Sequence, residues 1–157
     1  MHHLFRTKEI RRLICECENL TLKSHMAVKK TSNSIYIIDK GRNLCEIVVE
    51  GSDSLDTILE RYSVILNDEE WCSGMNVIVD MTQVRKLILS GQDVEMLGYH
   101  HRRLADKFGN GILCFIANQG YLYGIGRIFE FWTGQGGQKV HVCRSRDEAM
   151  KMLGIQA

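Results

Sequence analysis

Residues 76–117 read NVIVDMTQVRKLILSGQDVEMLGYHHRRLADKFGNGILCFIA, and this stretch decides the fold class. It opens and closes on short apolar runs, Asn76–Asp80 and Ile112–Ala117, which are typical of buried parallel strands. Between them, residues 90–93 (SGQD) have the pattern of a capping box and begin a predicted helix that ends at residues 109–111 (GNG). Strand, helix and strand in this order predict a βαβ unit with a right-handed crossover.

The segments before this unit predict a hairpin and a helix. Ser34–Asp39 and Leu44–Glu50 are β-branched runs joined by a turn with glycine, which indicates an antiparallel hairpin. Residues 51–54 (GSDS) then offer several helix caps. The helix behind them carries one apolar stripe, made of Leu55, Ile58, Leu59, Tyr62, Ile65 and Leu66. Its acidic residues, Asp53, Asp56, Glu60, Asp68, Glu69 and Glu70, are interpreted as a solvated face.

The segments after the unit continue the alternation. Residues 121–132 predict a helix whose inward residues are Ile125, Ile128, Phe129 and Trp132. A strand at Lys139–Cys143 and a last helix capped by Ser145 follow, whereas residues 81–89 are interpreted as a connection. The predicted order is ββαβαβαβα, which describes one α/β domain. Its sheet is mixed and mostly parallel with an antiparallel N-terminal hairpin, and the helices pack on the sheet.

Composition excludes several classes of protein. The chain has 157 residues, of which 45% are hydrophobic and 25% charged, the balance of a globular domain with a core rather than of a disordered or coiled-coil chain. No apolar run approaches the roughly 20 residues of a membrane helix. The formal net charge of +1 predicts neither nucleic acid nor membrane as a partner.

The first 30 residues differ from the rest. They carry seven Lys and Arg against three Glu, a net charge of +4, so the overall charge of +1 leaves −3 for residues 31–157. We interpret residues 1–30 as a basic appendage, or as a mis-assigned or artificially added start, and residues 31–157 as the domain. Residues 8–20 (KEIRRLICECENL) have the spacing of a short amphipathic helix.

The six cysteines indicate a reducing compartment. Cys45, Cys114 and Cys143 lie within apolar strand-like runs, where a free thiol acts as a small hydrophobic group. Cys15 and Cys17 form an isolated CxC, which lacks the second spaced pair of a zinc site, so no metal is predicted. The first 20 residues show no apolar signal region. The expected location is therefore the cytoplasm.

No pattern predicts catalysis. The sequence shows no Ser-His-Asp order, no paired catalytic carboxylates and no phosphate-binding lysine loop, so no catalytic residue, enzyme activity or cofactor is expected. One alternative is a nucleotide-binding, oxidoreductase-like fragment. Gly120, Gly124 and Gly126 have GxxxGxG spacing at the start of a predicted helix, and Arg144 and Arg146 follow where a 2′-phosphate is received.

The C-terminal third resembles a known family. Residues 112–118 (ILCFIAN), Tyr123–Glu130 (YGIGRIFE) and residues 140–153 (VHVCRSRDEAMKML) occur in that order. They are similar to the SpoIIAA-like (anti-sigma-factor antagonist-like) branch of the STAS domain superfamily, whose members show Y-G-x-x-R-x-(F/Y)-E. The resemblance implies a STAS-like domain over residues 31–157, related in shape to lipid-carrying CRAL-TRIO domains.

The resemblance also implies a phosphorylation switch. STAS regulators carry a phosphorylatable serine in an Asp-Ser-Ser-Gly turn at the start of a helix, and the matching residues here are 88–91 (ILSG). Ser90 and Gly91 match this turn, whereas the Asp and the first Ser do not. The alternative interpretation is that Ser90 only caps the helix, a contribution of about 1 kcal/mol.

Two binding functions follow from these observations. The first is non-enzymatic regulation or signalling through a protein partner, of the anti-sigma-antagonist type, with Ser90 as the switch. The second is a carrier or sensor of an amphipathic small molecule, held between the helix that Ser90 begins and the helix after it. Tyr121, Tyr123 and Arg127 are expected to line an opening for this ligand or partner, beside Gly91. The oligomeric state stays open, a homodimer included.

Overall fold

A computed structural model describes residues 26–134 and 138–156. Residues 1–25, with the Cys15–Cys17 motif and most of the predicted appendage, lie outside the described residues, as do residues 135–137 and 157. The strands are β1 (Lys29–Lys30), β2 (Ser34–Asp39), β3 (Leu44–Ser54), β4 (Asn76–Ile88), β5 (Ile112–Ile116) and β6 (Lys139–Cys143). The helices are α2 (Leu55–Leu66), α3 (Gly91–Arg103), α4 (Ala105–Phe108), α5 (Gly120–Thr133) and α6 (Arg146–Met152).

These strands form one mixed sheet whose spatial order follows the sequence, β1-β2-β3-β4-β5-β6. The pairs β1–β2 and β2–β3 are antiparallel, whereas β3 to β6 are parallel. The predicted α/β class, the antiparallel hairpin and the order ββαβαβαβα from Ser34 onward are confirmed. The structure adds the two-residue β1 at the edge and divides the predicted helix over residues 90–108 into α3 and α4.

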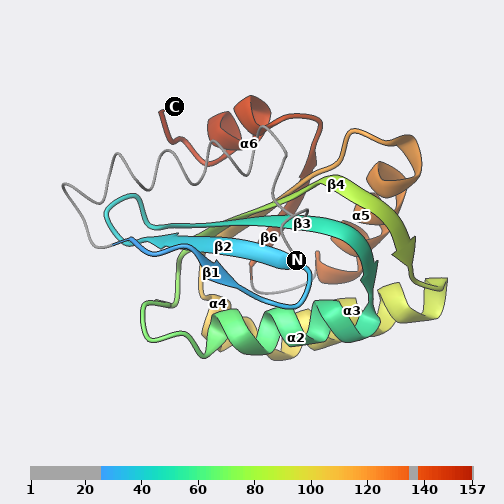
Figure 1. The fold of residues 1–157 in the computed structure, drawn as a ribbon, viewed down its shortest axis with the longest axis horizontal. Helices are drawn as coiled ribbons and strands as arrows, with labels where there is room; N and C mark the ends of the chain where they lie inside the picture. Colours follow the sequence, from blue (N-terminus) through green and yellow to red (C-terminus); the bar gives the residue numbers. More distant parts are fainter. Residues whose placement is uncertain (1–25, 135–137, 157) are drawn as a thin grey trace, which may run out of the picture.

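The helices lie on both sides of the sheet. Figure 1 shows α2 and α3 along one side and α6 along the other. On the α2 side, the main core packs Val77, Val79 and Leu113 of the strands against α2, α3 and α5. On the α6 side, Ala149 and Met150 pack against the strands in a smaller cluster with Cys114 and Cys143. The predicted burial of Cys45, Cys114 and Cys143 as free thiols is confirmed.

The interpretation of residues 81–89 as a connection is wrong. β4 continues to Ile88 because its second half pairs with the second half of β3, from Glu50↔Gln83 to Ser54↔Ile88. β5 pairs only with residues 77–80 of β4, so this half of the β3–β4 pair extends beyond the rest of the sheet. We call it the β3–β4 arm. Figure 1 shows both arrows bending toward the helices at this end.

The sequence pattern did not predict the arm as a pair of strands, because its register is irregular. Shifts occur between Val48 and Glu50 and between Gly51 and Ser52, and Gly51 has a φ of 69°. Such bulges interrupt the alternation of inward and outward side chains from which a strand is recognised.

The domain includes the last residues of the predicted appendage. Met26 is buried against β2 and β3, and Lys29 lies in β1. The Lys29 ammonium donates to both Asp68 carboxylate oxygens, at 2.7 and 2.8 Å, and to Glu70 at 2.7 Å. Burial opposes ionisation of Asp68, but the hydrogen bond from Lys29 lowers the pKa of this carboxyl below its ordinary value. Asp68 is thus part of a hydrogen-bonded ion-pair cluster with Lys29, and its assignment to a solvated face is wrong.

Gly98 allows α3 and α5 to pack closely. A Cβ atom at Gly98 would lie 2.5 Å from Cβ of Trp132 on α5, well inside van der Waals contact.

The face of α5 that packs against the core carries Leu122, Ile125 and Phe129. The prediction that Ile128 faces inward is wrong, since 48% of it is exposed. Ile128 lies a further 60° round the helix beyond Ile125, past the edge of the buried stripe.

None of the helices within residues 26–134 and 138–156 combines the length and the apolar character that a membrane span requires.

We predict that Gly98→Ala lowers the free energy of unfolding by about 1–3 kcal/mol, because the added methyl group separates α3 from α5. Gly124→Ala in α5 is the matched control, since a Cβ there meets nothing within 4 Å. Alanine is the better helix former, so Gly124→Ala should be neutral or stabilise by up to about 1 kcal/mol. Urea unfolding followed by circular dichroism measures both, and equal effects would contradict the packing role of Gly98.

Candidate ligand-binding cavity

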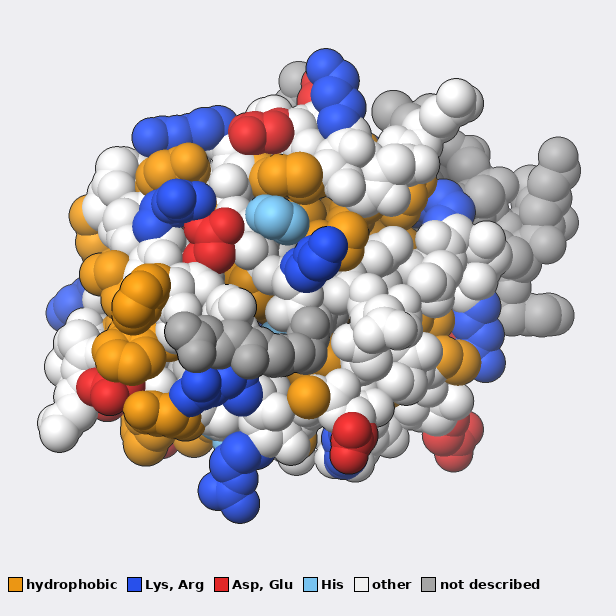
Figure 2. All heavy atoms as spheres, turned by 180° about the vertical axis from the view of Figure 1, so that it is seen from behind, with side chains coloured by type: hydrophobic (Ala, Val, Ile, Leu, Met, Phe, Trp, Pro, Cys, Tyr) orange, Lys and Arg blue, Asp and Glu red, His pale blue; other side chains and the backbone are white. Residues whose placement is uncertain are grey.

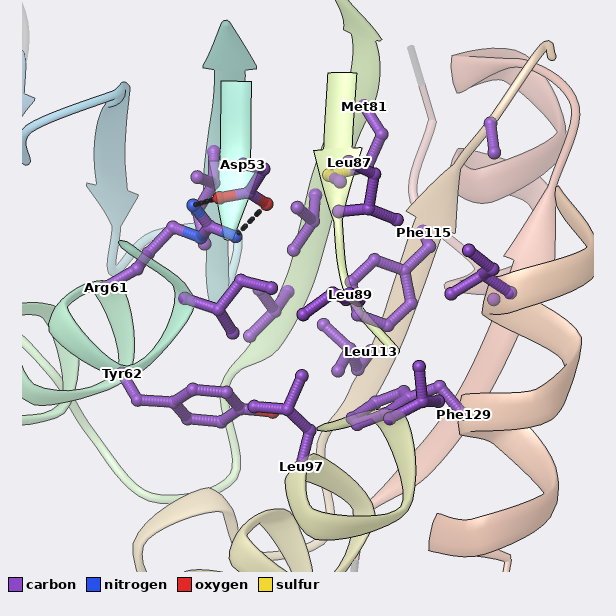
Figure 3. Close-up of a pocket in the computed structure, with 18 of the residues that line it drawn as sticks. Asp53, Arg61, Tyr62, Met81, Leu87, Leu89, Leu97, Leu113, Phe115 and Phe129 are labelled. Carbon is purple, nitrogen blue, oxygen red and sulfur yellow. Dashed lines mark hydrogen bonds and ion pairs between the residues drawn. The ribbon is translucent and has the colours of Figure 1, made fainter. Parts of the chain in front are cut away.

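An apolar cavity lies between the sheet and the helices α2, α3 and α5. Its volume is about 120 Å³. The side chains from the strands and the arm are Ile47, Val77, Val79, Met81, Leu87, Leu113 and Phe115. The helices contribute Ile58, Tyr62, Ile65, Val94, Leu97, Phe108, Leu122, Ile125 and Phe129, and Leu89 and Ala117 lie in the connections. Figure 3 shows Leu97, Leu113 and Phe129 directed into this space.

The cavity extends to the carboxyl end of the parallel strands. Asp53 and Leu87 come from the two strands of the arm, and Ala117 directly follows β5. In open α/β sheets, ligands bind at this end of the strands. The arm therefore places its side chains where the fold class most often has a binding site.

The charged residues of the lining are Asp53 and Arg61, which form a buried ion pair. Arg61 donates from Nη2 to Oδ2 of Asp53 at 2.9 Å and from Nη1 to Oδ1 at 3.2 Å. Asp53 is 0% exposed and Arg61 7% exposed. Figure 3 shows Arg61 extending from α2 to Asp53 on the side of the cavity opposite Phe115 and Phe129.

Asp53 is held by further donors. The Thr57 hydroxyl donates to its Oδ1 at 2.7 Å, and the Asn33 side-chain amide donates to the same oxygen at 2.8 Å. Burial opposes ionisation, but the charge and hydrogen bonds of Arg61 lower the pKa of Asp53. Asp53 is therefore a buried carboxylate with a full set of partners, and its assignment to a solvated face is wrong.

Sequence reasoning missed Arg61, although a signal existed. Arg61 lies on α2 within the apolar stripe, three residues after Ile58 and four before Ile65. Thr57 and Arg61 are four residues apart, which places them on one face of α2, and Asp53 lies four residues before Thr57 near the end of β3. A charged residue on a buried stripe, with an acid and a hydroxyl in line with it, indicates a buried ion pair.

A buried histidine lies behind one wall of the cavity. Nδ1 of His101 shares a hydrogen bond of 2.9 Å with the Tyr62 hydroxyl. The imidazole stacks on Phe108 at 4.3 Å between ring centroids and meets the edge of Phe129 at 5.6 Å. Burial, together with the neighbouring His100, lowers the pKa of His101 to about 4. The imidazole is thus neutral at physiological pH.

The structure places Ser90, Gly91 and Tyr121 near the end of the arm. The Ser90 side chain is exposed and accepts from the Asp93 backbone N–H at 3.1 Å, while its own backbone N–H donates to the Asp93 carboxylate at 2.8 Å. The predicted capping box is thus confirmed. Gly91 is exposed as the first residue of α3. The Tyr121 hydroxyl accepts from the backbone N–H of Leu87 at 2.9 Å, which ties the start of α5 to the arm.

Tyr123 and Arg127 have other neighbours. The Arg144 guanidinium lies 3.8 Å above the centre of the Tyr123 ring, and Arg127 pairs with Glu130 on α5. Tyr121, Tyr123 and Arg127 are not among the residues that line the cavity. On α5 the lining comes instead from Leu122, Ile125, Gly126 and Phe129.

The glycines of the GxxxGxG segment have different surroundings. A Cβ atom at Gly120 or Gly124 would meet nothing within 4 Å, whereas one at Gly126 would lie 2.9 Å from Val142 of β6. Gly126 thus lets α5 approach the sheet. The arginines of the nucleotide alternative are engaged within the protein, Arg144 over Tyr123 and Arg146 with the Glu46 carboxylate at 3.0 Å.

No protein-family model matches the chain, and no curated relative does. Solved structures that are similar to it include the following two. One is an uncharacterised protein of the DUF3478 family with a SpoIIAA-like fold from Shewanella loihica PV-4, at 12% identity and a TM-score of 0.46, covering 82% of this chain and 91% of that one. The other is the anti-sigma factor antagonist SpoIIAA in its unphosphorylated form, at 11% identity and a TM-score of 0.42, covering 82% and 97%.

We predict that the protein loses stability between pH 6.5 and pH 4 because of His101. In this range the unfolded chain binds a proton at an imidazole with the ordinary pKa of 6.5, whereas the folded chain, with a pKa of about 4, does not. The free energy of unfolding therefore falls as the pH falls, by about 3 kcal/mol from this group. Urea unfolding across the range should show a smaller slope in His101→Gln, and an unchanged slope would contradict the buried neutral state.

Proposed function

We propose that the chain is a non-catalytic, STAS-like binding domain that holds a small amphipathic molecule in the cavity between α2, α3, α5 and the sheet. The cavity itself carries the proposal. Its lining is apolar apart from three residues, Asp53, Arg61 and Tyr62. An apolar pocket with a few polar groups at the carboxyl end of a parallel sheet has the make-up of a small-molecule site.

The size of the cavity restricts the ligand. An apolar cavity of roughly 150 Å³ in another protein stays dry and takes up benzene or xenon. The cavity here, at about 120 Å³, is of that order. The part of the ligand that enters it is therefore a single ring or a short branched chain.

The bonding of the polar groups favours binding over chemistry. Asp53 is occupied by Arg61, Thr57 and Asn33, and the Tyr62 hydroxyl is bonded to His101. A general acid or base must have a proton or lone pair available to the substrate. Asp53 is held ionised and His101 neutral, so both act as fixed parts of the structure around the cavity rather than as groups that exchange protons.

We place this function in the cytoplasm, since Cys45, Cys114 and Cys143 are free thiols.

We predict that toluene, used as a probe of the cavity, raises the thermal midpoint of the full chain. At ten times its dissociation constant, a ligand of the folded state stabilises by about 1.4 kcal/mol, or about 4 °C for a domain of this size. Ala117→Leu should abolish this rise, because the larger side chain fills part of the cavity that Ala117 lines. Ala105→Leu in α4 is the matched control and should keep it. Equal responses in both variants would refute binding in this cavity.

A second candidate is regulation through a protein partner, favoured by an exposed apolar face on α3 and α5. Met96 and Tyr99 of α3 and Phe131 of α5 are all exposed, and Trp132 links the last two by ring contacts of 6.0 and 5.5 Å. Arg102 lies 4.5 Å above the Tyr99 ring. Figure 2 shows hydrophobic side chains gathered at the left of this view, with basic side chains among them. Ser90 caps the same helix α3, so a phosphate on it would add negative charge beside this face.

For this second function we predict phosphorylation of Ser90 by a kinase in a cell extract, detected by mass spectrometry. Ser145 is the matched control, since it is another exposed serine that caps a helix through its side chain. Ser90→Ala and Ser145→Ala should each cost about 1 kcal/mol of stability through the lost cap. Phosphate on Ser145 or elsewhere but never on Ser90 would contradict the switch and leave Ser90 as a cap alone.

A further inference from the structure

Arg61 has hydrogen-bonding capacity left for a ligand. A guanidinium group carries five N–H donors. Three hydrogen bonds from Arg61 reach described residues: Nη1 donates to Asp53 and to Asn33, at 3.2 and 3.3 Å, and Nη2 donates to Asp53 at 2.9 Å. The side chain lines the cavity and is 7% exposed. The N–H groups outside these three bonds remain as donors on a side chain that lines a mostly apolar cavity.

The ion pair also limits the charge that a ligand can bring. Asp53 neutralises Arg61, and the opposite wall, with Phe115 and Phe129, is apolar. An anionic ligand near Arg61 would lose its hydration and meet the fixed negative charge of Asp53. A neutral acceptor has neither cost, and it can take a hydrogen bond from a charged donor, which is stronger than one from a neutral donor.

We infer that the ligand of the cavity is an uncharged molecule with a ring-sized apolar body and one hydrogen-bond acceptor, such as a carbonyl oxygen, that accepts from Arg61. This inference rests on the proposed binding function and adds the chemical class of the ligand. Arg61 selects the ligand, because only a ligand with an acceptor at one position gains a hydrogen bond from the guanidinium group. Asp53, being 0% exposed, holds the guanidinium in place.

Three probes of equal heavy-atom count test this class. Acetophenone carries a carbonyl oxygen, α-methylstyrene replaces that oxygen by a methylene group of similar shape, and benzoate adds a charge. Dissociation constants for the full chain come from titration calorimetry. The decisive quantity is the Kd of α-methylstyrene divided by the Kd of acetophenone, compared between wild type and the double variant Asp53→Asn with Arg61→Met. This comparison cancels the different solubilities of the two probes in water.

We expect the ratio to fall by about tenfold in the double variant, which leaves the site without net charge and removes the charged guanidinium donor. Asp39→Asn with Arg42→Met is the matched control, since it removes an ion pair on the β2–β3 hairpin that does not line the cavity. Its ratio should equal that of wild type. In wild type, acetophenone should also shift the guanidinium ¹⁵N resonances of Arg61 and α-methylstyrene should not, a readout that does not depend on the folding of any variant.

The outcomes separate the two proposals. If both neutral probes bind but the ratio is unchanged and the Arg61 resonances do not respond, the role of Arg61 is wrong and cavity binding stands. If benzoate binds more tightly than acetophenone, the uncharged class is wrong. If none of the probes binds to wild type, the proposed binding function itself fails.

Discussion

The parallel pairing of β3 with β4 is the constraint on which the rest of the structure depends. It runs from Leu44↔Asn76 to Ser54↔Ile88, well beyond the strands that follow. One end builds the centre of the sheet, and the other forms the arm that borders the cavity. The arm leads directly into α2 through Ser54 and into α3 through Ser90, so both helices begin where this pairing ends. A hydrogen bond from the Leu87 backbone N–H to the Tyr121 hydroxyl also links the start of α5 to the end of the arm.

This arrangement brings the two proposed functions to one segment. Leu87 and Leu89 line the cavity, and Ser90 follows them immediately. A ligand would therefore contact the residues that lead into α3, the helix that carries Met96 and Tyr99 on its exposed side. The buried Asp53–Arg61 pair borders the same end of the cavity, since Asp53 is the cross-strand partner of Leu87. The cavity and the exposed face are thus connected through one segment, and the function proposed for each can be tested without the other.

Local patterns predicted the regular parts of the fold well. Short apolar runs identified Asn76–Asp80, Ile112–Ala117 and Lys139–Cys143, and serine caps placed the starts of α3 and α6. These signals succeed because strand burial and helix capping depend on neighbours a few residues away. The arm was missed, since its bulges break the alternation that marks a strand. The inward placement of Ile128 failed for a related reason: the width of the buried stripe depends on how α5 lies on the sheet.

The sequence by itself determined the α/β class, the order of elements, the hairpin and the capping role of Ser90, because all of these follow from local spacing. Only the tertiary structure decided what the charged residues do. Asp53 belongs to an acidic run in the sequence, yet in the fold it is buried against Arg61, Thr57 and Asn33. The cavity likewise exists only where three helices and the arm meet. The burial of a residue depends on the packing of helices against the sheet, so it cannot be predicted from one segment of the sequence alone.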